Sequence, residues 1–163
     1  GLREVILTDG TVPLADYAFY AATMRSVTVG TGATEVGVRA FGGCNNLREV
    51  SLPAGITAVR EHAFSECTAL EAVTLPEGVT ELGVNAFLGC TALETVTLPQ
   101  TLERLPSGVF LGCRRLKDID LGGVRTVGSN AFRGCGALET VRAAGDVTFS
   151  EGNGTAEKLV GRV

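Results

Sequence analysis

One spacing recurs along this 163-residue chain and limits its possible folds more than any other feature. Phenylalanine returns every 22 or 23 residues, preceded by alanine in five units and by valine in one. In the last five units, cysteine follows three residues after the phenylalanine. A unit this regular over most of the chain predicts a solenoid of stacked repeats. The phenylalanines are Phe19, Phe41, Phe64, Phe87, Phe110 and Phe132.

Each unit also contains an apolar segment with the pattern Leu-x-x-Val-x-Leu. In the copy at residues 70–75, Val73 and Leu75 point to one side of an extended chain and Thr74 points to the other. This alternation is typical of a strand with one buried face and one solvated face. Stacked units would place the strands in one parallel sheet, ~4.8 Å apart. The seven segments span residues 2–7, 24–29, 47–52, 70–75, 93–98, 116–121 and 138–143.

A turn and a second, shorter apolar pair follow each strand, and they predict a short second strand. The Ala-Phe-x-x-Cys segment is too short for a regular helix. We expect it to form one helical or 3₁₀ turn that directs phenylalanine and cysteine inward. The apolar pairs are Ala33/Val36, Ile56/Val59, Val79/Leu82, Leu102/Leu105 and Val124/Val127.

The repeat unit resembles the BspA-like leucine-rich-repeat family over about residues 2–143. The family consists largely of bacterial cell-surface and secreted proteins, and some members bind host matrix proteins or other bacteria. The resemblance implies a right-handed solenoid, an extracellular or cell-surface location and no catalytic residues. Pro106 in place of glycine, Gly122 in place of proline, and a first unit without cysteine depart from the pattern. One complete unit reads Leu70-x-x-Val73-x-Leu75-Pro76-x-x-Val79-Thr80-x-Leu82-Gly83-x-x-Ala86-Phe87-x-x-Cys90.

Together these features predict an α/β fold. Residues 1–143 are expected to form a leucine-rich-repeat solenoid of about six to seven repeats of 22–23 residues. One parallel sheet would cover one face, with short second strands and one-turn helical segments on the other side. Residues 144–163, where the pattern fades, are predicted to be a partial C-terminal cap or a linker.

The five cysteines occupy the same position in successive units. Metal sites need clustered spacings such as Cys-x-x-Cys, and none occurs here. Parallel side chains one rung apart suit disulfide geometry poorly, so we favour a ladder of buried free thiols over an oxidised pair or a reactive thiol. The single histidine, His62, lies in a column of varied residues and is expected to be exposed rather than catalytic. We therefore predict no enzyme activity, no cofactor and no metal.

Composition narrows the possible partners. The net charge of −4 argues against a nucleic-acid ligand, which a basic surface usually binds. No run of 18 apolar residues exists, so we expect no membrane insertion by this segment.

The polar columns beside the strands are the predicted binding surface. Side chains repeated at the strand spacing make a flat, extended area that suits a protein partner, such as a host matrix protein or another surface protein. Two hypotheses follow: a protein-binding or adhesion module, or a structural spacer of a larger surface protein with no ligand of its own. The candidate residues are Arg3, Arg25, Arg48, Glu49, Glu71, Thr74, Glu94, Thr97, Lys117, Asp118 and Asp120.

Overall fold

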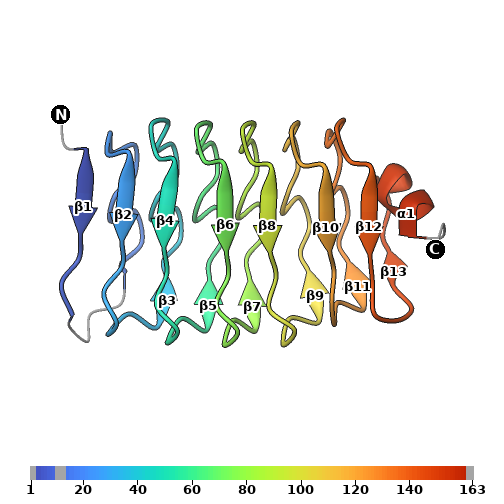
Figure 1. Ribbon diagram of the computed structural model, residues 1–163, viewed down its shortest axis with the longest axis horizontal. Coiled ribbons are helices and arrows are strands. Elements are labelled where there is room, and N and C mark those ends of the chain that lie inside the picture. Colours follow the sequence, from blue (N-terminus) through green and yellow to red (C-terminus); the bar gives the residue numbers. More distant parts are fainter. Residues whose placement is uncertain (1–2, 10–13, 161–163) are drawn as a thin grey trace.

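The computed structural model describes residues 3–9 and 14–160, and it is a solenoid of parallel strands (Figure 1). All seven predicted first strands are present and lie side by side along the long axis, although Leu2 of the first segment lies outside the described residues. Each strand has three residues, of which the middle one faces the core. These strands are β1 (Glu4–Ile6), β2 (Ser26–Thr28), β4 (Glu49–Ser51), β6 (Ala72–Thr74), β8 (Thr95–Thr97), β10 (Asp118–Asp120) and β12 (Thr140–Arg142).

The predicted second strands are also present, each two residues long. They form a second row parallel to the first (Figure 1). The apolar residue that ends each of these strands is directed into the core, except at the last, half-buried Phe149. They are β3 (Glu35–Val36), β5 (Ala58–Val59), β7 (Glu81–Leu82), β9 (Arg104–Leu105), β11 (Thr126–Val127) and β13 (Thr148–Phe149).

The Ala-Phe-x-x-Cys segments are not helical, so the prediction of one-turn helical segments is not confirmed. They are consecutive tight turns in which N–H groups alternate between two kinds of acceptor. The Ala40 N–H donates locally to Gly37 O over 3.1 Å, whereas the Phe41 N–H donates to Ala63 O of the next rung over 2.8 Å. A helix directs all its N–H groups to its own turn and would leave the next rung unbonded. Stacking therefore favours turns over a helix.

This turn side forms an unbroken ladder along the solenoid. Two residues before each phenylalanine, an N–H group bonds the next rung over 2.9–3.1 Å. The donors and acceptors are Tyr17→Val38, Arg39→Glu61, His62→Val84, Asn85→Ser107, Gly108→Ser129 and Asn130→Glu151.

Stacked phenylalanine rings form the centre of the core. Neighbouring ring centroids lie 5.3–5.8 Å apart, in the range that favours offset stacking. Phe41, Phe64, Phe87 and Phe110 are fully buried, and Phe19 at the first rung is half-buried. Because every unit contributes a phenylalanine ring and several aliphatic side chains to one shared core, no unit is stable by itself.

The ring column ends at Phe132, where the chain changes conformation. Gly154 stands where the next phenylalanine would be, and the helix α1 (Gly154–Val160) begins there and packs against β12 (Figure 1). Asn153 is buried just before α1. Its Oδ1 accepts the Phe132 N–H over 3.0 Å, and its Nδ2 donates to Gly128 O over 2.8 Å. The side chain thus bonds the last turn in place of a further rung.

Candidate functional site

The predicted binding residues lie where the sequence places them, on the solvated face of the first-strand row. We define the candidate face as the outward side chains of β1, β2, β4, β6, β8, β10 and β12, with the residue that precedes each strand. All eleven predicted residues on it are exposed. Alternation explains this for the residues within the strands, because the middle residue of each strand is directed inward and its two neighbours face water. The residue that precedes each strand lies outside this alternation and is exposed as well.

The candidate face is interrupted at two places that the repeat pattern does not predict. Backbone pairing joins β1, β2 and β4, then β6 and β8, then β10 and β12, but it is missing between β4 and β6 and between β8 and β10. In paired rungs, a bond such as Leu75 N→Thr97 O measures 3.0 Å. The equivalent bonds from Leu52 to Thr74 and from Leu98 to Asp120 are absent. The face is therefore three short sheets side by side.

A hollow of about 810 Å³ extends from β1 across β2 and β4 to the turn after β6 and so includes the first interruption; we call it the first hollow. Its floor includes Ala72, whose small side chain follows glutamate in the same column of the previous rung. Val50 and Leu52 at this interruption are half-buried, whereas Val73 and Leu75 of the next rung are almost completely buried. The charged lining consists of one guanidinium, Arg48, and four carboxylates: Glu4, Glu49, Glu71 and Glu77.

A smaller hollow of about 370 Å³, the second hollow, lies over the interruption between β8 and β10. Its charged lining consists of Glu77, Asp118, Asp120 and Arg142. Glu77, in the turn after β6, lines both hollows. The Asp120 Oδ1 accepts the Gly122 N–H over 2.9 Å, which fixes that carboxylate at the rim.

The structure brings together part of the predicted set. Arg48, Glu49, Glu71 and Thr74 line the first hollow, and Thr97, Asp118 and Asp120 line the second; Arg3, Arg25, Glu94 and Lys117 are exposed but line neither. Sequence reasoning missed Glu77 as a site residue because it lies in a turn rather than a strand column. Ala72 was the feature of the sequence that could have indicated a hollow here, since it interrupts a column of longer side chains.

The charges on the candidate face are mostly unpaired with one another. Among the described residues, its one ion pair joins Arg142 to Asp118 over 3.8 Å, with both side chains more than half exposed. The other charged side chains of the face form no ion pair within the part of the chain that the structure describes. Such groups are available to a partner of complementary charge.

The cysteine ladder is chemically inert in this fold. All five cysteines are free and buried, and each thiol donates to the carbonyl of the phenylalanine one rung back, as Cys90 Sγ does to Phe64 O over 3.1 Å. Burial raises the pKa of Cys44 to about 11 and that of Cys135 to about 12. The reactive thiolate is therefore suppressed, and the interpretation as structural thiols is confirmed.

His62 is partly buried rather than fully exposed as expected. Its Nε2 lies 3.4 Å from Asn85 Nδ2, and burial, with a smaller contribution from Arg39, lowers its pKa. Within residues 3–9 and 14–160, the His62 ring forms no hydrogen bond with a nucleophile or a carboxylate. Within the same residues, no group of three His, Cys, Asp or Glu side chains is close enough to hold a metal ion. The described helix is too short to cross a bilayer.

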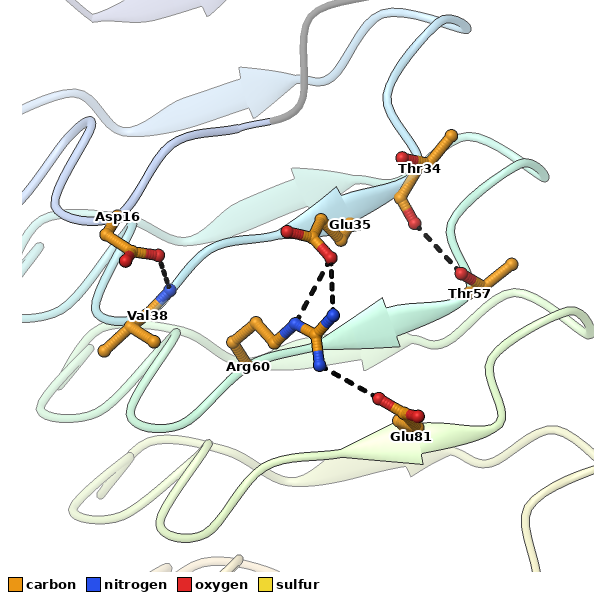
Figure 2. A network of polar contacts seen from close by, with 7 residues as sticks. All are labelled: Asp16, Thr34, Glu35, Val38, Thr57, Arg60 and Glu81. Atoms are coloured by element: carbon orange, nitrogen blue, oxygen red, sulfur yellow. Dashed lines mark hydrogen bonds and ion pairs between the residues drawn. The ribbon is translucent and has the colours of Figure 1, made fainter.

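The second row of strands carries a different polar cluster (Figure 2). The Arg60 guanidinium lies between Glu35 and Glu81, with Nη2 2.7 Å from Glu35 Oε2 and Nη1 3.0 Å from Glu81 Oε2. The hydrogen bonds that the Arg60 guanidinium donates to Glu35 are the main cause of its raised pKa. The three side chains come from successive rungs, so the cluster ties β3, β5 and β7 together. Because these groups are well exposed, the pairs add about 1 kcal/mol or less each.

Comparison with known families gives one match over most of the chain. The model described as "BspA type Leucine rich repeat region" matches residues 12–139 in six copies. The family resemblance inferred from the repeat unit is confirmed. A comparison with functionally curated proteins gives no match.

Solved structures of bacterial leucine-rich-repeat proteins share the fold. The T. pallidum leucine-rich-repeat protein TpLRR is 28% identical with a TM-score of 0.62, and the alignment covers 85% of this chain and 86% of that one. The pneumococcal vaccine antigen PcpA is 22% identical with a TM-score of 0.73, and the alignment covers 87% of this chain and 40% of that one. A leucine-rich cell surface protein from Faecalibacterium prausnitzii is 20% identical with a TM-score of 0.50, and the alignment covers 89% of this chain and 60% of that one.

Proposed function

Because this chain belongs to the BspA-type leucine-rich-repeat family, we propose that it is a non-catalytic protein-binding module of a bacterial cell-surface or secreted protein. The candidate face is the proposed binding surface. Neighbouring structures that include a cell surface protein and a vaccine antigen support an extracellular location. The proposed partner is a protein, such as a host matrix protein or another surface protein.

The observation that carries this proposal is the state of the charges on the candidate face. Eleven exposed side chains lie along the first-strand row, and Arg142 with Asp118 is its one ion pair among the described residues. On the second row, by contrast, Arg60 is already paired with two glutamates. Electrostatic complementarity sets specificity and the rate of association, so unpaired charges on an extended face suit a protein partner.

The test is surface-plasmon binding of the chain to immobilised fibronectin and fibrinogen at low and physiological salt. A charge-reversed variant of the candidate face carries Arg48→Glu, Glu71→Lys and Glu94→Lys. A control with the same change in net charge carries Arg125→Glu, Glu103→Lys and Glu151→Lys, all exposed and away from the candidate face. We expect saturable binding that the first variant loses and the control keeps.

The alternative is a structural spacer with no ligand of its own. The continuous column of stacked phenylalanines supports it, because such a column makes a stiff rod whether or not the face is occupied. Absence of saturable binding, or weak binding that vanishes at physiological salt and ignores the face variant, would favour the spacer.

A further inference from the structure

Within the part of the chain that the structure describes, the second row of strands is interrupted once, between β7 and β9. Its strands form one sheet of β3, β5 and β7 and another of β9, β11 and β13. At the same boundary the first row is intact, because β6 and β8 are paired along all three residues. The turn side is intact as well, since the Asn85 N–H donates to Ser107 O over 3.1 Å. These two rungs are therefore joined on two sides and open on the third.

Pro106 is the cause of this interruption. In five other units, the residue that follows the second apolar pair donates its N–H to a carbonyl of the preceding rung over 2.7–3.0 Å. Pro106 occupies the same position but has no N–H, so Leu82 O cannot receive this bond. The five bonds are Gly37→Leu14, Arg60→Val36, Gly83→Val59, Gly128→Leu105 and Ser150→Val127.

A second bond of the same ladder is missing beside Pro106. The Thr80 N–H donates to Thr57 O of the preceding rung over 3.0 Å, and the Arg125 N–H donates to Glu103 O over 2.8 Å. Across residues 3–9 and 14–160, no equivalent bond joins the Glu103 N–H to Thr80 O. The loss of one donor at Pro106 is thus accompanied by separation of the strand that precedes it.

The side chains are also spaced most widely at this boundary. The ring centroids of Phe87 and Phe110 lie 5.8 Å apart, compared with 5.3 Å for Phe64 and Phe87. A hollow of about 370 Å³ extends from β5 to β9 over the gap, with Leu82 and Pro106 in its lining. Water can therefore bond the backbone groups that lack a ladder partner.

This interruption differs in kind from the two on the candidate face. Leu52 and Leu98 keep their N–H groups, so a small movement of the strands can restore the bonds that are missing there. Leu82 O has no such donor at any separation of the rungs, because Pro106 lacks the hydrogen. The second row is therefore permanently weaker at this boundary.

We propose that Pro106 makes this boundary a hinge in the solenoid. The first row and the turn side stay joined, and bending separates β7 from β9 without breaking a second-row hydrogen bond. The candidate face continues across the paired strands β6 and β8. The angle between its two halves, β1 to β6 and β8 to β12, therefore changes as the hinge opens. This inference goes beyond the proposed binding function, because the hinge is a property of the chain alone.

Two spin labels on the second row test the hinge. Cysteines replace Thr34 and Thr148, which are exposed and lie on opposite sides of the boundary, while the buried native thiols stay unlabelled. Double electron–electron resonance gives the distribution of distances between the labels. We expect this distribution to narrow in Pro106→Ala, which supplies the missing N–H and keeps a β-carbon, as Arg60 does at the equivalent position.

Two controls separate the hinge from other effects of the substitution. Labels at the exposed first-row positions Thr28 and Thr140 lie on the same two sides of the boundary. Their distance distribution should respond to Pro106→Ala clearly less, because the first row stays joined. Pro76→Ala removes a proline from the turn after β6 and should leave the second-row distribution unchanged.

Hydrogen exchange gives an independent readout. In the parent chain, the Glu103 amide should exchange faster than the ladder amides of Thr80 and Arg125. In Pro106→Ala, exchange at Glu103 should slow about fivefold, the scale of one net backbone hydrogen bond. The new amide at position 106 should be protected as well.

Two results would overturn the hinge. One is a second-row distance distribution that is the same in the parent and in Pro106→Ala. The other is equal narrowing in Pro76→Ala. Neither measurement needs a partner, so the hinge can fail while the proposed function stands, and failure of matrix-protein binding leaves the hinge in place.

Discussion

One residue in each of six units, two positions before the phenylalanine, adopts the same backbone conformation. The six φ values lie between 53° and 64°, a left-handed region that L-residues enter at a cost of about 1–2 kcal/mol. From the sequence, the column looks tolerant of any side chain. The structure shows that its constraint lies in the backbone, which a comparison of side chains does not reveal. The members are Tyr17, Arg39, His62, Asn85, Gly108 and Asn130.

Substitutions at His62 test this constraint. His62→Val should be less stable than His62→Gly by about 1–2 kcal/mol, because a β-branched residue fits a φ of 55° poorly and glycine fits it freely. Urea unfolding gives both values. At Thr126, an exposed strand position, valine should be the more stable of the two. The same order at both sites would contradict the interpretation.

The buried thiols predict a loss of stability at alkaline pH. Burial raises the pKa of each cysteine above its unfolded value near 9, so folding keeps the thiols protonated. Their contribution is complete below pH 9 and is lost as pH rises toward the folded-state pKa. Each thiol that ionises only on unfolding removes about 1.4 kcal/mol per pH unit.

Urea unfolding between pH 7 and pH 10.5 measures this loss. Cys90→Ala should lower the free energy of unfolding at pH 7. Above pH 9 that free energy should fall less steeply than in the parent chain, because one titrating thiol is missing. Val96→Ala, which removes a buried side chain without a titrating group, should give a curve parallel to the parent. Parallel curves for all three chains would rule out a contribution from Cys90.

Among the elements, the strands follow from the sequence and the turns do not. Alternation in segments such as Leu70 to Leu75 specifies one buried and one exposed face, which is enough to predict strands, their order and the solvated columns. The Ala-Phe-x-x-Cys turns depend on bonds to the next rung, which are not local. The missing pairing between β4 and β6 depends on how neighbouring rungs diverge in space. The sequence pattern alone therefore could not predict the hollows or the position of Glu77 in their lining.

We propose that residues 144–163 act as a C-terminal cap, and Asn153 is its central residue. Asn153→Ala removes the acceptor for the Phe132 N–H and the donor to Gly128 O. The expected loss of stability is about 1–3 kcal/mol, because buried hydrogen-bonding groups lose their partners. Hydrogen exchange of the Phe132 amide should become faster. Asn153→Asp keeps the acceptor and should retain protection at Phe132 better than alanine; equal exchange in the two variants would contradict the role.

At the scale of the whole molecule, stacking between neighbouring rungs predicts that the contribution of each phenylalanine to stability depends on its position in the column. Phe64 stacks between Phe41 and Phe87 and is fully buried, so Phe64→Ala should cost about 3–5 kcal/mol. Phe19 is half-buried and stacks on Phe41 alone among the described rings, so Phe19→Ala should cost clearly less. Urea unfolding of both variants checks the order. Equal costs would mean that stability is not a sum over neighbouring rungs.

The unbroken hydrogen-bond ladder on the turn side has a mechanical consequence. One edge of the solenoid is bonded from Tyr17 to Glu151, while both strand rows are divided into blocks. Under a pull along the long axis, the turn edge resists extension and the interruptions yield first, so the rod bends and its candidate face widens at the two hollows.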